Sequence, residues 1–366
     1  MTTAELSVPT GRALRNRPFR TVRIAEVQRL CDDAAAITFA IPDEYASEFV
    51  FSPGQSVTIR RTIDDIEQRR TYSICAAAGS SPRVGVREVP GGAFSGWLVH
   101  QLAPGDEVDI QPPSGSFTAD PDVAANHVLI AAGSGITPVL SIAASVLAHP
   151  DSTVTLLYGN RRANTVMFAD ELADLKDAHG SQLQVVHVLS REPRASELFS
   201  GRLDRERIHA LLQRLVPVAA VDHFWLCGPF GMVNDAQAAL DDLGVGADRV
   251  HLELFFVEDA APDQAKHAEA AATGQVSSVT IILDGSESTL SLPQTISILD
   301  GAQQARDDLP FACKGGVCGT CRAKITDGAV DMRRNYALDP SEVEAGFVLT
   351  CQSFPTTDSL TVDFDA

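Results

Sequence analysis

Short runs of alternating apolar and polar residues dominate the first third of the chain. They are rich in β-branched residues, and Pro–Gly and Pro–Pro pairs separate them, which is typical of short strands joined by turns. The predicted strands are 21–27, 36–41, 56–60, 70–75 and 84–89. Strands of this length and spacing favour a closed antiparallel barrel. We therefore expect residues 18–120 to form a β-barrel, preceded by a flexible N-terminus at 1–17.

The pattern changes after residue 120, where short apolar runs alternate with amphipathic stretches. The apolar runs predict strands at 127–132, 153–158, 184–189 and 223–227. The stretches between and after them predict helices at 139–148, 168–178, 205–215 and 232–243. Strand–helix alternation of this kind indicates a parallel sheet with helices on its faces. Residues 121–257 are thus predicted to be an α/β domain.

The last third begins with an Ala-rich, charged stretch that lacks apolar periodicity. We predict a linker at 258–274. Two strands, 279–283 and 289–292, then flank a turn at Asp284–Gly285, and a helix is expected at 297–306. Residues 275–366 are therefore predicted to be a compact α+β domain, which makes the chain a multidomain protein.

The composition is that of a globular protein with a strong acidic bias. The 366 residues carry a net charge of −19, with 45% hydrophobic and 21% charged residues. Such a charge argues against nucleic acid or an anionic membrane as a partner. The uncharged stretch 127–148 is long enough to span a membrane, but Gly133, Gly135 and Pro138 interrupt it. Because no apolar signal segment follows the N-terminal arginines, we expect a cytoplasmic protein.

Four of the seven cysteines have the spacing of a plant-type [2Fe–2S] site. Cys313, Cys318 and Cys321 form C-x4-C-x2-C, and Cys351 follows at a distance. One loop then supplies three ligands around a small inorganic core, while a remote segment supplies the fourth. The glycines of the loop CKGGVCGTC allow its backbone to approach the sulfides. The alternative is a non-catalytic zinc-binding module, although zinc usually takes two C-x2-C pairs and only one is present.

A flavin site is predicted on the barrel from Arg70-Thr71-Tyr72-Ser73. Arg70 can bind a phosphate, Tyr72 can stack on an isoalloxazine ring, and Ser73 can reach the flavin N5. Downstream, Gly92 and Ser95 lie in a glycine turn before an amphipathic stretch, which suits a pyrophosphate. An ordinary exposed strand is the alternative for the four-residue match alone.

A nicotinamide site is predicted where the first α/β strand ends, in Gly133-Ser134-Gly135-Ile136-Thr137-Pro138. The glycines allow close approach to a pyrophosphate, and Thr137 is expected to cap the following helix. A plain glycine turn is the alternative. Cys227 and Gly228, at the end of the fourth strand, are expected beside the nicotinamide ring, although most such cysteines simply fill the core.

The residues after the second strand bear on the choice of nucleotide. An NAD site usually places an acidic residue here, but this chain has Asn160, Arg161 and Arg162. Arginines attract a 2′-phosphate, so we expect NADPH, with solvated surface arginines as the alternative.

Taken in order, the motifs RTYS, GGAFS, AAGSGITP, YGNR, CGP and CKGGVCGTC resemble the ferredoxin–NADP reductase superfamily fused to a plant-type ferredoxin. The resemblance covers the chain from about residue 18 to its end. Several segments are most similar to the reductase subunits of phenylacetyl-CoA epoxidases: RRTYSIC, YGNR with Met167–Phe168, NYAL at 335–338, GFVLTCQ at 346–352 and VDFDA at 362–366. One departure is Arg162–Ala163, where relatives often have serine, which leaves the 2′-phosphate contacts open.

The resemblance implies FAD in the barrel, NADPH in the α/β domain and a β-grasp fold around the cluster. It places Arg70 at the flavin phosphates, Tyr72 at the ring and Ser73 at N5, with Cys227 near the nicotinamide. It further implies hydride transfer from NADPH to the flavin and single-electron transfer through the cluster to a diiron oxygenase, here the phenylacetyl-CoA epoxidase complex. Two alternatives stay open, namely an NADH- and FMN-using reductase of a Rieske-type oxygenase and a reductase of a steroid hydroxylase.

Overall fold

The computed structural model of the protein describes residues 18–63, 66–256, 275–306, 309–311, 314–317, 319–338 and 340–366. The chain divides into two compact units, one of residues 19–258 and one that contains 259–366 together with Met1–Pro18. The predicted flexible N-terminus and the predicted linker lie outside the described residues. None of the described helices is both long and apolar enough to cross a membrane.

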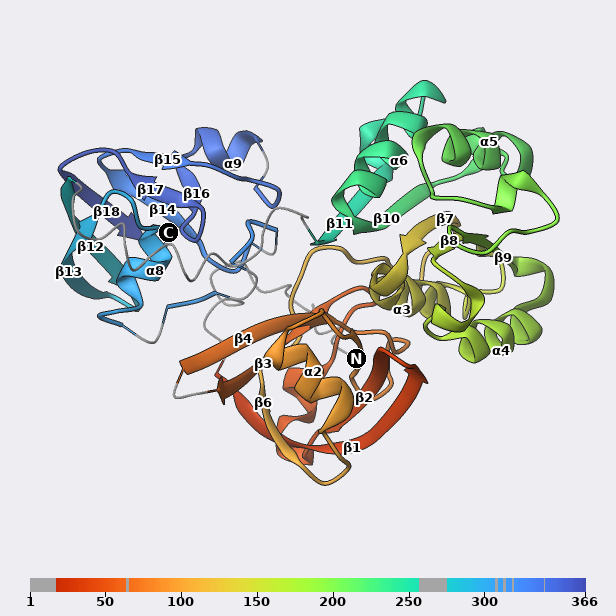
Figure 1. Ribbon diagram of the computed structural model, residues 1–366, viewed down its shortest axis with the longest axis horizontal. Coiled ribbons are helices and arrows are strands. Elements are labelled where there is room, and N and C mark those ends of the chain that lie inside the picture. Colours follow the sequence, from red (N-terminus) through yellow and green to blue (C-terminus); the bar gives the residue numbers. More distant parts are fainter. Residues whose placement is uncertain are drawn as a thin grey trace, which may run out of the picture. The chain divides into compact units, whose positions relative to one another are not determined.

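Six antiparallel strands form the barrel of the first unit, in the order β4-β3-β6-β1-β2-β5 (Figure 1). Their bounds are β1 Arg20–Cys31, β2 Ala34–Ala40, β3 Ser56–Ile63, β4 Ile66–Ser73, β5 Arg83–Arg87 and β6 Glu107–Ile110. An isolated bridge between Ile74 and Val84 joins the two ends of the sheet. Helix α2 (Ala93–His100) buries Phe94 and Leu98 among the strand side chains. The predicted barrel is confirmed, with β6 as a strand that the sequence pattern missed.

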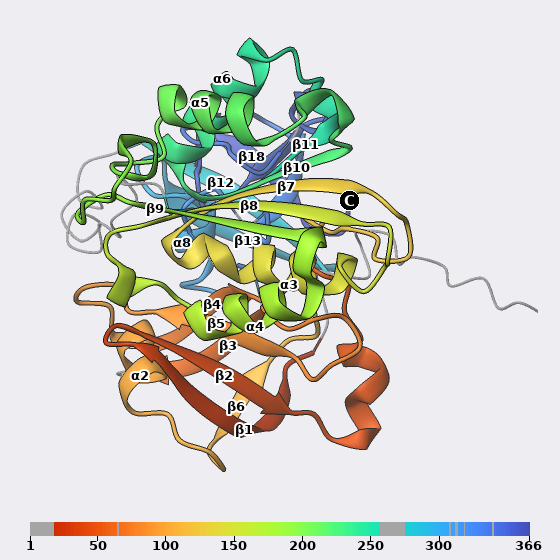
Figure 2. The same ribbon diagram turned by 90° about the vertical axis from the view of Figure 1, so that its right-hand side faces the viewer.

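Five parallel strands follow in the same unit, in the order β11-β10-β7-β8-β9. They are β7 Asn126–Ala132, β8 Thr153–Asn160, β9 Leu183–Leu189, β10 His223–Pro229 and β11 Val250–Phe256. Figure 2 shows α5 and α6 on one face of this sheet and α3 and α4 on the other. These helices are α3 Ile136–Val146, α4 Ala169–His179, α5 Arg205–Leu215 and α6 Phe230–Asp242. Four strands and four helices were predicted close to these positions, and edge strand β11 was not.

The barrel and the parallel sheet pack directly against each other. The Arg83 guanidinium forms an ion pair with Glu171 at 2.8 Å. The Ser141 hydroxyl donates to the Ala76 carbonyl at 2.6 Å, and Ser145 Oγ accepts from the Ala78 N–H at 2.9 Å. Residues on both sides of this contact are buried, so the barrel and the parallel sheet are packed together as one unit.

The second unit has a mixed sheet in the order β13-β12-β18-β14-β16 and a two-stranded ribbon β15-β17 (Figure 1). The elements are β12 Val276–Leu283, β13 Ser286–Pro293, α8 Ile298–Ala302, β14 Arg322–Asp327, β15 Val330–Met332, α9 Pro340–Glu344, β16 Phe347–Leu349, β17 Ser353–Pro355 and β18 Ser359–Asp363. The β12–β13 hairpin and the parallel β12–β18 pair fit the expected α+β, β-grasp architecture.

The helix expected at 297–306 is wrong in length, because α8 covers only Ile298–Ala302. Gly301 lies inside it, and a Cβ there would meet the Leu292 side chain at 1.8 Å. Close contact with β13 therefore demands a glycine, which weakens the helix locally.

Candidate active site

The sheet order reverses between β7 and β10, and the loops after both strands meet at that point. A Cβ on Gly135 would lie 2.2 Å from the Cys227 carbonyl oxygen, so only glycine fits between the two loops. Gly133 has φ +56°, which also favours glycine. Open α/β sheets bind ligands at the carboxyl ends of the strands beside such a reversal. The structure thus brings together Gly133, Gly135, Cys227 and Gly228, which the sequence motifs had separately suggested.

Thr137 does not cap helix α3, and that prediction is wrong. The short 3-10 turn Gly133–Gly135 runs straight into the helix, whose N-cap position is Gly135. Thr137 is only 1% exposed, and its hydroxyl donates to the Ser134 carbonyl at 3.0 Å. Its side chain therefore stabilises the glycine turn, and direct contact with a nucleotide stays a prediction.

Strand β4 carries the predicted flavin residues on the barrel. The Tyr72 ring stacks on Phe94, with centroids 6.5 Å apart, and burial raises its pKa. The Arg70 guanidinium donates to the Arg69 carbonyl at 2.7 Å and to Gln68 at 3.3 Å. Within the described part of the chain Arg70 has no ion pair with a carboxylate, so its charge is available to a phosphate.

Gly92 and Ser95 shape the turn that leads into α2. The Ser95 hydroxyl accepts from the Val89 N–H at 3.0 Å and donates to the Gly92 carbonyl at 3.4 Å. Gly92 is the N-cap residue of α2, and Gly91 before it has φ +75°. Ser95 is therefore engaged within the turn, and the N–H groups that begin α2 are the groups left to meet an anion.

A carboxyl group that the sequence analysis missed joins the barrel to the sheet. Glu253, on the edge strand β11, pairs in register with Cys227 on β10. Its Oε2 accepts from the Ser73 hydroxyl at 3.2 Å and lies 4.0 Å from the Cys227 sulfur. The overlooked signal was the alternating segment HLELFF at 251–256, which ends the α/β domain as a strand.

Burial controls the protonation of the Glu253 carboxyl and the Cys227 thiol. Burial raises the pKa of Glu253 to about 7, against a smaller opposing effect of the Ser73 hydrogen bond. Burial, and then the Glu253 charge, raise the pKa of the Cys227 thiol well above its usual value. Burial therefore favours an uncharged thiol and a protonated carboxyl group at this site. Such a group can hold or release a proton beside a reacting ring.

The carboxyl ends of β8 and β9 form a second part of the site. The Asn160 carbonyl accepts from the Ser190 N–H at 2.9 Å, and the Arg161 carbonyl accepts from the Arg191 N–H at 2.8 Å. Both arginine side chains are exposed, which suits recognition of a phosphate. Sequence reasoning found Arg161 but not Arg191, which lies two residues after the third strand.

The Asn160 side chain is 7% exposed, and neither atom of its amide has a hydrogen-bond partner among the described residues. Buried amides are normally paired, and contact of the Asn160 amide with a ligand stays a prediction.

The iron–sulfur loop is described in part, because Cys313 and Cys318 lie outside the described residues. Cys321 and Cys351 are 3% and 7% exposed. The Thr350 N–H and hydroxyl donate to the Cys321 carbonyl at 3.1 and 2.9 Å, which brings the two cysteine segments together. Gly316 and Gly319 have φ of +80° and +66°, the conformation that lets backbone N–H groups face a cluster. These features fit a [2Fe–2S] group.

Three parts of the chain match known domain families. Residues 21–119 match the oxidoreductase FAD-binding domain, 129–238 the oxidoreductase NAD-binding domain, and 281–356 the 2Fe-2S iron-sulfur cluster binding domain. The 1,2-phenylacetyl-CoA epoxidase of Escherichia coli (strain K12) has a component that is 38% identical over 353 residues, which cover 95% of this chain and 98% of that protein. This chain belongs to the FAD- and [2Fe–2S]-containing oxidoreductase family of that protein.

Other members and a solved structure agree with this assignment. The 3-ketosteroid-9-alpha-monooxygenase ferredoxin reductase component of Rhodococcus rhodochrous is 33% identical, over 91% of this chain and 93% of that protein. The fold matches phthalate dioxygenase reductase, described as a modular structure for electron transfer from pyridine nucleotides to [2Fe-2S]. That comparison has a TM-score of 0.63 at 23% identity and covers 94% of this chain and 98% of the other.

The cofactors of this oxidoreductase are FAD, a [2Fe–2S] cluster and a nicotinamide cosubstrate. The match of 281–356 assigns the cysteine loop to iron and sulfide rather than to zinc. The geometry fits all three groups, because Arg70 is free of carboxylates in the described structure, the Asn160 amide lacks a partner there, and the cysteine loop is glycine-rich.

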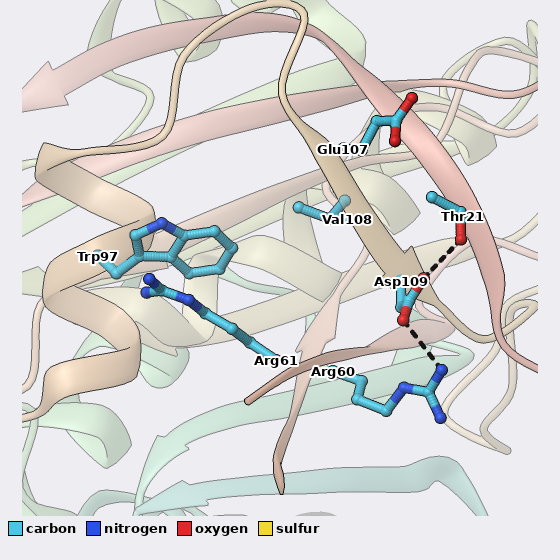
Figure 3. A pocket seen from close by; sticks show the side chains of 7 residues that line it. All are labelled: Thr21, Arg60, Arg61, Trp97, Glu107, Val108 and Asp109. Atoms are coloured by element: carbon cyan, nitrogen blue, oxygen red, sulfur yellow. Dashed lines mark hydrogen bonds and ion pairs between the residues drawn. The ribbon is translucent and has the colours of Figure 1, made fainter. Parts of the chain in front are cut away.

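A hollow of about 220 Å³ on the barrel is lined by residues of β1, β3, β6 and α2. Figure 3 shows the Arg61 guanidinium beside the Trp97 ring, 4.1 Å from its centroid, and Asp109 hydrogen-bonded to Thr21 and Arg60. The charges of Asp109 and Arg60 thus neutralise each other. None of the predicted cofactor residues lines this hollow.

Proposed function

We propose that this oxidoreductase takes a hydride from NADPH and delivers single electrons to a diiron oxygenase of the phenylacetyl-CoA epoxidase type. The observation that carries the proposal is the meeting of Ser73 from the barrel with Cys227 and Glu253 from the parallel sheet. One site thereby joins the flavin-binding face to the nucleotide-binding edge. Bound FAD supplies a two-electron acceptor for the hydride, and a [2Fe–2S] cluster supplies a one-electron carrier.

The residues of this chain position and protect that chemistry. Arg70 and the α2 N-terminus hold phosphates, and Tyr72 supports the ring. The buried Cys227 side chain limits water at the nicotinamide position. The Ser73 hydroxyl donates to Glu253, which keeps a proton-exchanging group at the flavin edge. Cys313, Cys318, Cys321 and Cys351 serve as the metal ligands.

The preference for NADPH is supported by the paired segments that carry Arg161 and Arg191. A 2′-phosphate is the part of NADPH that NADH lacks, and two guanidinium groups on adjacent segments suit it. The choice of partner is supported by the similarity to the Escherichia coli epoxidase component.

A second candidate is a reductase of a steroid monooxygenase, because the Rhodococcus rhodochrous component is also similar over nearly its whole length. The two candidates differ in the oxygenase that accepts the electrons.

The test uses purified holoprotein and its Cys318→Ser variant, with NADPH or NADH as donor. We expect NADPH-dependent ferricyanide reduction in both proteins, since Cys318 lies outside the flavin site. Oxygen-dependent turnover of the phenylacetyl-CoA epoxidase oxygenase is expected only with the unmodified protein. Turnover that survives in Cys318→Ser, or that occurs only with a steroid monooxygenase, contradicts the proposal.

A further inference from the structure

We propose that basic side chains beside the iron–sulfur loop form a docking surface for an acidic region of the oxygenase. We call this surface the basic collar and define it as Lys314, Arg333 and Arg334. The inference rests on the proposed function, because it concerns the point where electrons leave the chain.

The charges of the 275–366 segment are unevenly distributed. The segment is acidic overall, and nearly all of its basic residues lie close together in the sequence. Its acidic residues are Asp284, Glu287, Asp300, Asp307, Asp308, Asp327, Asp331, Asp339, Glu342, Glu344, Asp358, Asp363 and Asp365. Its basic residues are Arg306, Lys314, Arg322, Lys324, Arg333 and Arg334, and all but Arg306 lie between 314 and 334. Positive charge is thus concentrated in the segment that contains the cluster loop.

Backbone contacts place the collar next to a cluster ligand. Gln352 follows Cys351, and its side-chain nitrogen donates to the Lys314 carbonyl at 2.8 Å. Its backbone carbonyl accepts from the Arg333 N–H at 3.0 Å. The Arg334 carbonyl lies 3.3 Å from the position that a Cβ on Gly316 would take. The two segments that carry the collar therefore touch each other and surround the residue after Cys351.

Two of the three collar side chains, Lys314 and Arg333, are accessible to a partner. The side chains of Lys314 and Arg333 are 42% and 55% exposed. The Arg333 guanidinium lies 3.5 Å from the centroid of the Phe354 ring, which fixes the orientation of its plane.

Lys314 contacts Asp300 at 2.8 Å, and Arg333 contacts Asp331 at 3.6 Å. Exposed ion pairs of this kind contribute little in water, so carboxylates of a docking protein can replace them.

The occupant is assigned to the separate oxygenase rather than to the flavin-binding unit of this chain. The flavin-binding unit is covalently attached, so its effective concentration at the cluster does not depend on charge. An untethered partner must find the cluster by diffusion, and complementary charge increases that association rate. A basic collar on an acidic protein also keeps the protein from docking onto basic surfaces in a non-productive orientation.

The experiment compares Lys314→Glu/Arg333→Glu with the matched control Arg306→Glu/Lys324→Glu, which makes the same charge change outside the collar, on the side chain that contacts Ser288 of β13 and on β14. Iron content and the visible spectrum verify that each variant holds its cluster. At low ionic strength, we expect the second-order rate of electron transfer to the epoxidase oxygenase to fall about tenfold or more relative to the control. The difference should shrink as salt is added.

Two further readouts separate the possible outcomes. Reduction of the cluster by NADPH within one chain is expected to keep its rate; an equal slowing there assigns the collar to the flavin-binding unit and overturns the proposal. Equal rates in the two double variants overturn it as well. If the unmodified protein passes no electrons to the oxygenase, the proposed function fails. Acidic cytochrome b5 as acceptor then tests the collar independently, and an unchanged rate there refutes it.

Discussion

The carboxyl ends of the parallel strands lie on one side of the sheet and their amino ends on the opposite side. We call these sides the carboxyl edge and the amino edge, and their chemistry differs. At the carboxyl edge, Gly135 fits tightly against β10, and the Asn160 amide has no partner in the described structure. At the amino edge, the Trp225 indole donates to His127 at 3.2 Å, and the His223 and His251 ring nitrogens lie 3.1 Å apart. One edge leaves polar groups for a ligand, while the other largely pairs its polar groups internally.

Titration separates the two edges further. At the carboxyl edge, burial raises the pKa of the Glu253 carboxyl to about 7. At the amino edge, burial, and then His223, lower the pKa of His127 to about 4. The carboxyl edge disfavours ionisation of an acid, and the amino edge disfavours protonation of a base. Glu253 therefore lowers the stability of the fold as pH rises, whereas His127 lowers it as pH falls. This contrast is consistent with the proposed role of the carboxyl edge in cofactor binding.

The largest effect is expected from Gly135→Leu, which forces the two loops of the carboxyl edge apart. Its Cβ would overlap the Cys227 carbonyl, so the nucleotide turn has to move. We expect NADPH-dependent ferricyanide reduction to fall by about 100-fold or more, in line with the effect of misplacing reacting groups by an ångström. Gly231→Ala is the control, since nothing lies within 4 Å of its Cβ position. Normal activity of Gly135→Leu contradicts the assignment of this edge.

A smaller effect is expected from Arg161→Ala/Arg191→Ala, which removes the paired cations at the same edge. The KM for NADPH should rise about 10- to 100-fold, since the exposed pair together contributes roughly 1.5–3 kcal/mol, the range of one charged hydrogen bond. The KM for NADH should stay the same. Arg205→Ala, which removes an exposed pair with Asp242, is the matched control. An equal rise for both nucleotides would show that the arginines do not recognise the 2′-phosphate.

Much of this comparison was visible in the sequence, and the part that was missed has physical reasons. Glycine turns and apolar strands depend on local sequence, so the 133–135 turn and strands β7 to β10 were predicted. The role of Glu253 depends on β11 lying beside β10 and on Ser73 arriving from another domain. Neither contact is local. Arg191 was missed for the same reason, because its partner Arg161 is on a different strand end.

Glu253→Gln tests the carboxyl edge through the pH dependence of the unfolding free energy. The folded-state pKa of about 7 exceeds the unfolded value of 4.5, so the folded state binds more protons and stability falls as pH rises between these values. Between pH 5 and pH 7 the unmodified protein should lose about 2 kcal/mol of unfolding free energy that the variant keeps. Denaturant melts at several pH values measure this difference. Parallel curves for the two proteins would show that Glu253 does not titrate as proposed.

His127→Gln tests the amino edge and should have the smallest effect on activity. The folded-state pKa of about 4 lies below the unfolded 6.5, so His127 reduces stability as pH falls through this window. His223 and His251 also lower the pKa of His127, and the Asp222 carboxylate opposes this effect. We expect the variant to lose about 2 kcal/mol less stability than the unmodified protein between pH 7 and pH 5. Its KM for NADPH should be unchanged, and a raised KM would show that the two edges are not functionally separate.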